Sequence, residues 1–333
     1  MEGSRMKKAS VVIPNWNGMR FLKDCLDALR LQDTDDFETL VIDNASEDES
    51  VAFIKENYPE VRVEVMEENL GFSGGVNEGI RLSEAPYVLL LNNDTEVTPS
   101  FVREMIAAIE KDPKAFSVSA KMLKFHERER IDDAGDLYTL LGWGAQRGVD
   151  RRADEKRYEK PCTVFSACAG AAIYRKEVFD RIGLFDRMHF AYLEDIDVGY
   201  RAMLYGYKNV YAPKAVVYHV GSGTTGSKYN DFKVRLAARN NIYLLRKNMP
   251  LFQRILNGPW LLLGRGLKRL FFKKRGFLEA YDAGLKEGRE TAERLARVPF
   301  SFRRFPAYLR IEGLLIRYSF TYLFEYVGRR FMH

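Results

Sequence analysis

Residues 87–95 read YVLLLNNDT, an apolar run without a charge that is followed directly by two amides, a carboxylate and a hydroxyl. The run at 87–91 predicts a strand buried on both faces, as found inside a parallel sheet. Carboxylate and amide oxygens directly after such a strand suit a hard divalent cation such as Mg²⁺ or Mn²⁺. Because Asn-Asn-Asp is also good turn sequence, a surface turn is the competing interpretation of residues 92–94.

The rest of the first 120 residues repeats the alternation of a short apolar run with a longer amphipathic stretch. Near-continuous apolar strands separated by helices predict a mostly parallel α/β sheet covered by helices on both faces. Ligands of such sheets bind beyond the carboxyl ends of the strands, so the residues after each strand are candidates for a site. The expected strands are 9–14, 37–42, 61–66 and 87–91, and the expected helices are 20–31, 49–58, 76–82 and 100–111.

Polar residues follow all four strands and would line one edge of the sheet. The carboxylate of Asp43 could accept hydrogen bonds from a base edge or from ribose hydroxyls, with a helix cap as the competing interpretation. The glycine loop at 71–75 lacks GxGxxG spacing and follows the third strand, which excludes a dinucleotide-binding dehydrogenase. A helix that starts near Gly75 would still offer free amides to an anion. The four loops are PNWNG (14–18), DNAS (43–46), NLGFSGGVN (69–77) and NNDT (92–95).

The middle of the chain breaks this pattern. Residues 121–160 contain the charged runs HERER and DRRADEKR, and we expect a solvated excursion there. Order returns with an expected strand at 168–175, a helical turn at 176–182, a helix at 194–205, and strand-like segments at 209–212 and 215–218.

Three carboxylates, Glu194, Asp195 and Asp197, lie within four residues at the start of the expected helix 194–205. A helix N-terminus favours negative charge, so a stabilising cap is one interpretation. The functional interpretation requires one of them to act as a general base that takes a proton from a hydroxyl group. Neighbouring aromatic and apolar side chains would reduce its solvation and raise its pKa.

His219 ends an apolar run and precedes the glycine-rich residues 220–226. A lone His is more often structural than a ligand, yet a neutral imidazole is also a competent metal ligand. Both interpretations stay open on the sequence.

The net charge of +6 is divided unevenly along the chain. Residues 251–333 contain 17 basic and 7 acidic side chains, a local charge of +10, and the first 250 residues carry −4. An acidic body with a basic tail indicates an anionic surface for the tail and argues against a nucleic-acid-binding protein.

Cysteine spacing and hydropathy give expectations about location. Cys25, Cys162 and Cys168 form neither an even disulfide set nor a paired zinc spacing, which is typical of reduced thiols in a cytoplasmic protein. The longest uncharged apolar stretch of the tail, 255–264, is about half the length that spans a bilayer. We therefore expect a protein that does not cross a membrane and has no signal peptide.

Six motifs, taken in order and spacing, resemble the family 2 glycosyltransferases of the GT-A fold over roughly residues 8–245. Two further stretches, CAGAAIYRKEVFDRIGLFD and RNNIYLLRKN, are similar to bacterial rhamnosyltransferase-like enzymes that build cell-surface polysaccharides. The resemblance implies a mixed, mostly parallel sheet flanked by helices, of the nucleotide-diphospho-sugar transferase type. The six motifs are VVIPNWNG, VIDNASEDES, NLGFSGGVNEG, LLLNNDT, YLEDIDVGYRA and YHVGSGT.

The resemblance also implies a nucleotide-sugar site. Its expected residues are Pro14, Asn15, Asn17 and Asp43 in contact with the nucleotide, Gly74 and Asn77 beside it, and Asn92 and Asn93 at the nucleotide sugar.

The chemistry implied by the resemblance depends on four further positions. Asp94 matches the metal-binding aspartate of the family's DxD motif, whose first Asp is replaced by Asn92, so the cation would have fewer charged ligands. His219 would complete the site for Mn²⁺ or Mg²⁺. Asp195 matches the catalytic base of inverting members, and Glu194 would orient the acceptor or that base.

The expected function is therefore inverting, metal-dependent transfer of a sugar, with dTDP-rhamnose as the favoured donor and a hydroxyl of a glycan or lipid-linked acceptor as the target. A UDP-hexose-dependent enzyme of the same fold and a non-catalytic sugar-nucleotide-binding scaffold at the membrane are the alternatives. A nucleotidyltransferase is disfavoured because its glycine-rich signature with a Lys or Arg is missing after the first strand.

The tail lies outside the resemblance. We expect a glycosyltransferase domain at 1–248 and a basic amphipathic helical region at 249–333, in which aromatic and basic residues alternate. Such stretches suit the headgroup layer of an anionic membrane, which predicts a peripheral protein on the inner face of the cytoplasmic membrane. Packing on the first domain and a homodimer interface are the competing interpretations of residues 250–330.

Overall fold

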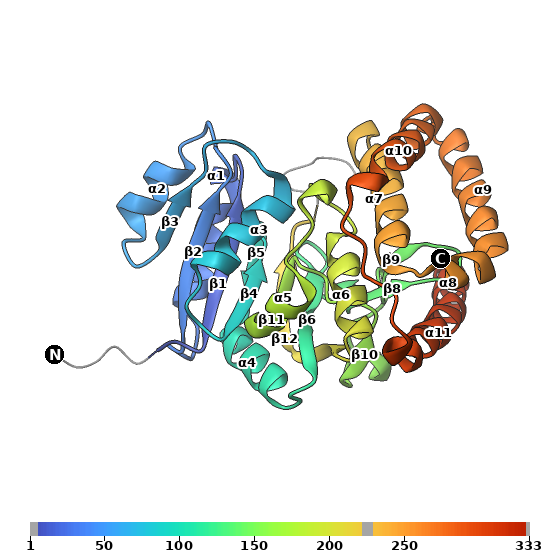
Figure 1. Ribbon diagram of the computed structural model, residues 1–333. Coiled ribbons are helices and arrows are strands. Elements are labelled where there is room, and N and C mark those ends of the chain that lie inside the picture. Colours follow the sequence, from blue (N-terminus) through green and yellow to red (C-terminus); the bar gives the residue numbers. More distant parts are fainter. Residues whose placement is uncertain (1–5, 222–228, 331–333) are drawn as a thin grey trace.

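The computed structural model describes residues 6–221 and 229–330, and Figure 1 shows their arrangement. Most of the glycine-rich loop expected after His219 lies outside the described residues. Within them, ten strands form one sheet whose main path runs β10-β12-β6-β11-β4-β1-β2-β3. The strands of this path are β1 (Ala9–Asn15), β2 (Phe37–Asp43), β3 (Arg62–Val65), β4 (Tyr87–Leu91), β6 (Ala115–Lys124), β10 (Cys162–Val164), β11 (Ala171–Arg175) and β12 (Lys208–His219).

The direction of the strands confirms the expected mixed, mostly parallel sheet. Strand β1 pairs in parallel with β2 and β4, β2 does so with β3, and β12 does so with β6. Strand β11 lies between β4 and β6 and is antiparallel to both. The carboxyl ends of β1, β2 and β4 therefore meet at one edge, as the sequence predicts.

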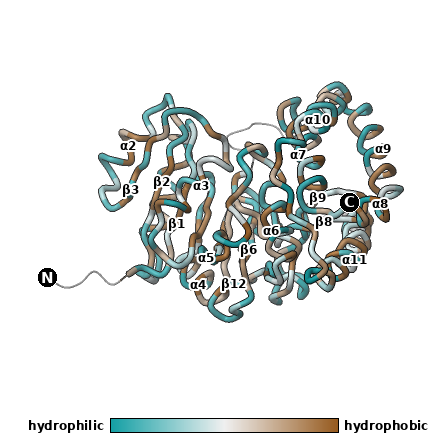
Figure 2. Tube along the Cα trace, viewed as in Figure 1, coloured by the Kyte–Doolittle hydropathy of each residue, from teal (hydrophilic) through white to brown (hydrophobic). Residues whose placement is uncertain are grey.

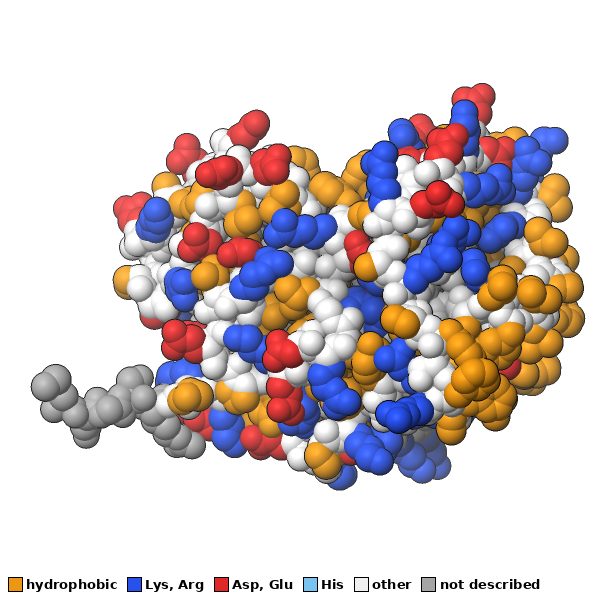
Figure 3. Space-filling model, in the orientation of Figure 1, with side chains coloured by type: hydrophobic (Ala, Val, Ile, Leu, Met, Phe, Trp, Pro, Cys, Tyr) orange, Lys and Arg blue, Asp and Glu red, His pale blue; other side chains and the backbone are white. Residues whose placement is uncertain are grey.

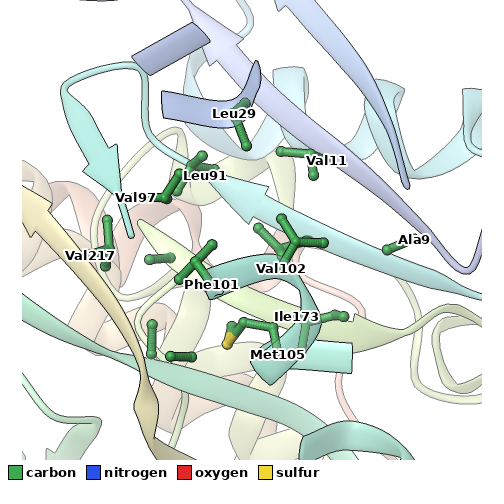
Figure 4. Packing of buried hydrophobic residues seen from close by; sticks show 14 of the residues in the cluster. Ala9, Val11, Leu29, Leu91, Val97, Phe101, Val102, Met105, Ile173 and Val217 are labelled. Atoms are coloured by element: carbon green, nitrogen blue, oxygen red, sulfur yellow. The ribbon is translucent and has the colours of Figure 1, made fainter. Parts of the chain in front are cut away.

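Side chains of the central strands alternate between two buried layers. On β1, Val11 and Ile13 belong to one hydrophobic cluster and Val12 to another, all of them fully buried. Helices α1 (Met19–Arg30) and α4 (Phe101–Glu110) supply the first layer, part of which Figure 4 shows around Phe101 and Met105. Helices α3 (Gly71–Leu82), α5 (Lys176–Ile182) and α6 (Glu194–Leu204) supply the second. Burial on both faces explains the uncharged strand sequences.

Two expectations about local structure were wrong. Helix α3 begins at Gly71 rather than near residue 75, and two of its first amides already have partners: Gly71 N donates to Asn69 Oδ1 (2.8 Å) and Ser73 N to the Phe190 carbonyl (3.0 Å). These amides are not free for an anion. The cause is tertiary, because the loop before α6 supplies the second acceptor and so extends the helix through glycine-rich sequence.

Residues 121–160 are not a solvated excursion. Strand β6 continues to Lys124, β7 (Ile131–Asp133) pairs with it, and β8 (Asp136–Tyr138) pairs with β9 (Gly144–Gln146). Ile131, Leu137 and Tyr138 are fully buried. The charged runs form ion pairs at the rim of this small unit, such as Arg151 with Glu155, while the residues between the runs are packed inside.

The helices from α7 to α11 form a C-terminal helical region, drawn in yellow to red in Figure 1. The inner faces of this region pack on the first part of the chain: Tyr308, Ile311 and Leu315 share a cluster with Leu137 and Tyr200. The boundary at 248/249 stays a prediction. Its helices are α7 (Asp231–Asn248), α8 (Leu251–Leu256), α9 (Gly258–Lys274), α10 (Leu278–Thr291) and α11 (Phe305–Arg330), whereas α2 (Ser50–Asn57) lies between β2 and β3 in the chain.

Candidate active site

A chain of side-chain hydrogen bonds joins the ends of β4, β1 and β2. Asn93 Nδ2 donates to Asn15 Oδ1 (2.8 Å), and Asn15 Nδ2 donates to Asp43 Oδ1 (2.8 Å). Ser46 closes the chain, since its hydroxyl and its amide donate to the two oxygens of Asp43 (2.6 and 2.9 Å). Asp43 is fully buried. The structure thus brings three of the predicted residues together in one fixed network.

Gly18 leaves room for this network. A Cβ at position 18 would lie 2.1 Å from Asn93 Nδ2 and 2.2 Å from Asn15 Oδ1, so any side chain would break the hydrogen bond between them. Pro14 is partly buried and Asn17 is exposed in the same loop. Asn17 has a left-handed backbone (φ 49°), and its Oδ1 accepts the amide of Glu47 (2.8 Å).

The other two residues expected beside the nucleotide, Gly74 and Asn77, lie within α3 and are buried. The Asn77 amide donates to the Phe185 carbonyl (2.8 Å) and accepts from the Phe185 amide (3.0 Å). This pair of bonds fixes the loop that leads to α6. Contact of Gly74 and Asn77 with a nucleotide stays a prediction.

Asp94 and His219 converge at the end of β12. His219 Nε2 lies 3.3 Å from Asp94 Oδ1, and His219 Nδ1 lies 2.7 Å from Asp132 Oδ2. Burial disfavours the charged imidazole, but the hydrogen bonds to Asp132 and Asp94 outweigh it and raise the pKa of His219 to about 10. A carboxylate that holds the far nitrogen of a His orients the near nitrogen toward a metal in many metalloproteins.

This donor set fits a divalent cation that displaces the Nε2 proton of His219, because a ligating imidazole must be neutral. Asp94 offers a hard oxygen and His219 an imidazole nitrogen, both of which Mn²⁺ and Mg²⁺ sites accept more readily than thiolate. The separation of 3.3 Å is about the distance between neighbouring ligands whose bonds to one ion are near 2.1 Å long.

The loop before β11 connects this edge to α6. The Asn92 amide donates to the Gly170 carbonyl (2.8 Å), and the amide of the preceding residue, Ala169, donates to the Asp195 carboxylate. Asp195 also accepts the amide of Ile196 (2.7 Å) and is only half-buried. The Asp195 carboxylate is therefore anchored next to the end of β4.

The three carboxylates at the start of α6 have different environments. Burial, followed by repulsion from Asp195, raises the pKa of Glu194 well above its usual range, and its Oε2 has no hydrogen-bond partner. Burial also raises the pKa of Asp195. Asp197 behaves oppositely: burial opposes its ionisation, but the charges of Arg201 and Lys247 prevail and hold its pKa well below its usual range.

Asp197 is therefore part of the framework. Arg201 Nη2 and Nε donate to Asp197 Oδ2 (2.8 and 3.0 Å), and Asn248 Nδ2 donates to Asp197 Oδ1 (2.6 Å). Arg201 also donates to the carbonyls of residues 182–184 and so ties α6 to the end of α5.

Three acidic residues near the site were missed on the sequence: Asp132, Asp133 and Asp136. Asp132 contacts His219, and Asp136 is hydrogen-bonded to Asp195. Burial raises the pKa of Asp133 and of Asp136 well above their usual range. The sequence signal was present in IDDAGDL (131–137), where three carboxylates stand between apolar residues, but the flanking charged runs concealed it.

Comparison with known proteins gives one family. The family model described as glycosyl transferase family 2 matches residues 10–183, which include all of the edge from β1 to β4. This confirms the family expected from the six motifs.

Two curated relatives indicate the range of similar proteins. An N-acetylglucosaminyl-diphospho-decaprenol L-rhamnosyltransferase from Mycobacterium tuberculosis is 25% identical over 208 residues, 56% of this chain and 67% of the relative. A poly-beta-1,6-N-acetyl-D-glucosamine synthase from Staphylococcus epidermidis is 23% identical over 253 residues, 75% of this chain and 58% of that synthase.

Solved structures agree on the fold. GalNAc-T7, solved with UDP, GalNAc and Mn²⁺, has a TM-score of 0.59 and 19% identity; the match covers 73% of this chain and about half (48%) of that protein. The mannosyltransferase PcManGT from Pyrobaculum calidifontis, solved with GDP-Man and Mn²⁺, has a TM-score of 0.52 and 16% identity. The match covers 97% of this chain and 84% of the mannosyltransferase. At these identities the likeness confirms the GT-A fold alone.

Proposed function

Since this chain belongs to glycosyl transferase family 2, we propose that it is an inverting, metal-dependent enzyme that moves a sugar from a nucleoside diphosphate to a hydroxyl group of a glycan or lipid-linked acceptor. The observation that carries the proposal is the placement of Asp195. Its half-buried carboxylate is anchored by Ala169, next to the loop that holds Asn92 at the end of β4. Removal of a proton from an acceptor hydroxyl requires such a carboxylate beside the donor site.

The residues of the chain divide the work in this mechanism. Pro14, Asn15, Asn17 and Asp43 would bind the nucleotide, and Asn92 and Asn93 the nucleotide sugar. Asp195 accepts the proton of the acceptor hydroxyl while the oxygen of that hydroxyl attacks the anomeric carbon of the donor sugar. The bond from that carbon to the diphosphate breaks on the opposite side, so the configuration inverts. Glu194, kept neutral by burial, would orient the acceptor or the base.

Asp94 and His219 would hold the cation, and Asp132 would orient the His219 ring through Nδ1. When bound, Mn²⁺ or Mg²⁺ neutralises the charge that develops on the departing diphosphate.

Removal of the Asp132 carboxylate should weaken metal use without removing a ligand. We expect Asp132→Ala to need about 10–100-fold more Mn²⁺ for half-maximal transfer, because loss of such supporting carboxylates costs about that much. The measurement is transfer rate against free Mn²⁺ after dialysis with EDTA. Asp154→Ala, an exposed carboxylate of the same segment that pairs with Arg152, is the matched control. Full activity of the wild type in EDTA would remove the roles of Asp94 and His219.

The donor is proposed to be dTDP-rhamnose. Support comes from the similarity to a relative named as an L-rhamnosyltransferase and from the motifs shared with rhamnosyltransferase-like enzymes. A UDP-hexose-dependent transferase of the same fold is the second candidate, and cell-surface polysaccharide synthesis is the proposed context for both. A non-catalytic scaffold would bind the donor without releasing a nucleoside diphosphate.

Thermal unfolding in the presence of nucleotide sugars separates these candidates. At saturating concentration, dTDP-rhamnose with Mn²⁺ should raise the Tm by about 5 °C, since binding at 100 times Kd stabilises the folded state by about 2.7 kcal/mol. UDP-glucose and UDP-galactose should raise it less. The reverse order would replace the proposed donor by a UDP-hexose, and a shift without turnover in the presence of acceptor would favour the scaffold.

We also propose that the C-terminal helical region docks on an anionic membrane, at the inner face of the cytoplasmic membrane. Helix α9 supports this with an outward apolar stripe, because Trp260, Leu263, Leu267 and Leu270 are exposed at helical spacing while Leu261 on the other side is buried. Exposed Lys273, Lys274 and Arg275 end this helix, and apolar and polar residues alternate along it in Figure 2.

Helix α11 has a second outward stripe. Leu309, Ile316, Phe320 and Leu323 are exposed on one side, and the opposite side packs on the rest of the protein. Exposed Arg303, Arg310 and Arg317 lie along the same helix or just before it. Figure 3 shows hydrophobic side chains gathered near α8 and α11 with basic side chains around them. Apolar area ringed by cations suits an anionic headgroup layer.

No helix in the ranges 6–221 and 229–330 is long and apolar enough to cross a membrane. The proposed contact is with the surface of the bilayer.

Flotation with liposomes tests this contact on the full chain. We expect flotation with vesicles that contain anionic phosphatidylglycerol and little with neutral phosphatidylcholine. Leu267→Glu combined with Leu270→Glu should abolish it, whereas Leu31→Glu, at a still more exposed Leu outside the tail, should not. Unchanged flotation of the double variant would contradict the proposal. A different outcome would assign the stripes to a homodimer interface: the wild type does not float, it forms a dimer in the absence of lipid, and the double variant is a monomer.

A further inference from the structure

Asp136 is a buried carboxyl group fixed to a rigid part of the backbone. Its amide donates to the Ser166 carbonyl (2.9 Å), and its carbonyl accepts the Phe165 amide (3.0 Å). The Ser166 hydroxyl donates to Asp136 Oδ2 (3.2 Å). The side chain is only 6% exposed. Its carboxyl group therefore has one fixed position.

That position is against Asp195. The two side chains share a hydrogen bond, and their carboxylate oxygens, together with Cys168 Sγ, lie within 4.8 Å of one another. Two carboxylates cannot approach in this way while both are ionised, so one of them carries a proton. The strongest charges that act on Asp136 are those of Asp195 and Asp133, both acidic.

The surrounding donors decide which of the two is protonated. Asp195 accepts two backbone amides, from Ile196 and Ala169, and both favour its ionised form. Apart from the bond that it shares with Asp195, the Asp136 side chain accepts one hydrogen bond from the described residues, that of the Ser166 hydroxyl, and it is the more deeply buried of the pair. The proton therefore belongs on Asp136, which can then donate to the Asp195 carboxylate. Other titratable groups around the pair are Asp133, Cys168, Tyr174 and Glu194.

The same three side chains could be taken for a metal site. Burial, followed by the nearby carboxylates, raises the pKa of the Cys168 thiol well above its usual range. Mn²⁺ and Mg²⁺ prefer oxygen ligands to sulfur, so a site that includes the Cys168 sulfur does not suit the cation proposed for this enzyme.

We infer that Asp136 is a positioning residue for the reaction, whose protonated carboxyl group donates a hydrogen bond that holds the Asp195 carboxylate toward the acceptor hydroxyl. This rests on the proposed function, in which Asp195 is the base. Rotation of the base away from the acceptor hydroxyl lowers the rate of transfer but leaves the affinity of the enzyme for the donor unchanged.

Paired variants of Asp136 test the inference on the full chain. Asp136→Asn keeps a donor toward Asp195 and should lower kcat by only about 3-fold, while Asp136→Ala should lower it by about 100-fold, the cost of a misplaced catalytic group. The donor KM should stay within about twofold in both. Asp136→Leu, which fills the volume, is measured alongside Asp136→Ala, and each variant is checked for folding by its Tm.

The outcomes separate this inference from the proposed function. Rescue by Asn but not by Ala or Leu, with Asp195→Asn inactive, supports it. If Asp136→Asn is as inactive as Asp195→Asn, or if Asp136→Ala is as active as the wild type, the positioning role is overturned while Asp195 remains the base. An active Asp195→Asn overturns the base and the positioning role together.

Discussion

Replacement of Asp195 by Asn is expected to lower sugar transfer by about 10²–10⁴-fold, the usual contribution of a positioned general base. Asn has nearly the same shape, and its oxygen can still accept the amide of Ile196. It cannot accept the proton of the acceptor hydroxyl. Because Asn15, Asp43 and Asn93 form a separate network at the sheet edge, donor affinity should change by less than about twofold.

The measurement is kcat for transfer together with the Kd of the donor by calorimetry. Asp180→Asn, at an exposed carboxylate on α5, is the matched control and should retain wild-type values. Near-wild-type transfer by Asp195→Asn would remove the base from the mechanism. Loss of donor affinity in parallel with kcat would instead place Asp195 in donor binding.

The second large effect is expected on stability. Arg201→Met would leave the Asp197 carboxylate buried without its main partner and would free the carbonyls of residues 182–184. Both side chains of the ion pair are at most 2% exposed. Removal of one partner of a buried pair lowers the free energy of unfolding by about 3–5 kcal/mol. Lys247 lies 3.4 Å from Asp197 and offsets part of this loss, because its charge still stabilises the carboxylate.

Urea unfolding of the wild type and of Arg201→Met gives the difference in their free energies of unfolding. The slope of this free energy against urea concentration should be the same for both proteins. Arg269→Met removes an equally short pair with Asp282, but one that lies in solvent, and should show no measurable change. Equal losses in the two variants would contradict the structural role given to Asp197 and Arg201.

Local patterns predict strands β1 to β4, helices α1, α2 and α4, the turn at α5, the start of α6 and the end of β12 at His219. An apolar run predicts a buried strand wherever it occurs, and parallel pairing then brings Asn15, Asp43 and Asn93 to one edge. Resemblance of the motifs supplied the fold and the family, which the family model confirms.

The errors lie where distant contacts decide. Strands β7 and β8 are three residues long and flanked by charged runs, so no periodic pattern marks them. Asp132 contacts His219, and Asp136 is hydrogen-bonded to Asp195. Both partners are far away in the chain, so the sequence around residues 132–136 does not indicate these contacts. Glycines predicted a loop at 71–75, but Asn69 and the Phe190 carbonyl complete a helix there.

The most direct test of sugar transfer with inversion is the anomeric configuration of the glycoside product, measured by proton NMR. The donor used is the nucleotide sugar that raises the Tm of the protein most. Attack by a hydroxyl that Asp195 deprotonates, in one displacement, predicts a configuration opposite to that of the sugar in the donor. A product with the configuration of the donor would require two displacements and a nucleophile in the protein. That result would contradict the mechanism proposed for this chain.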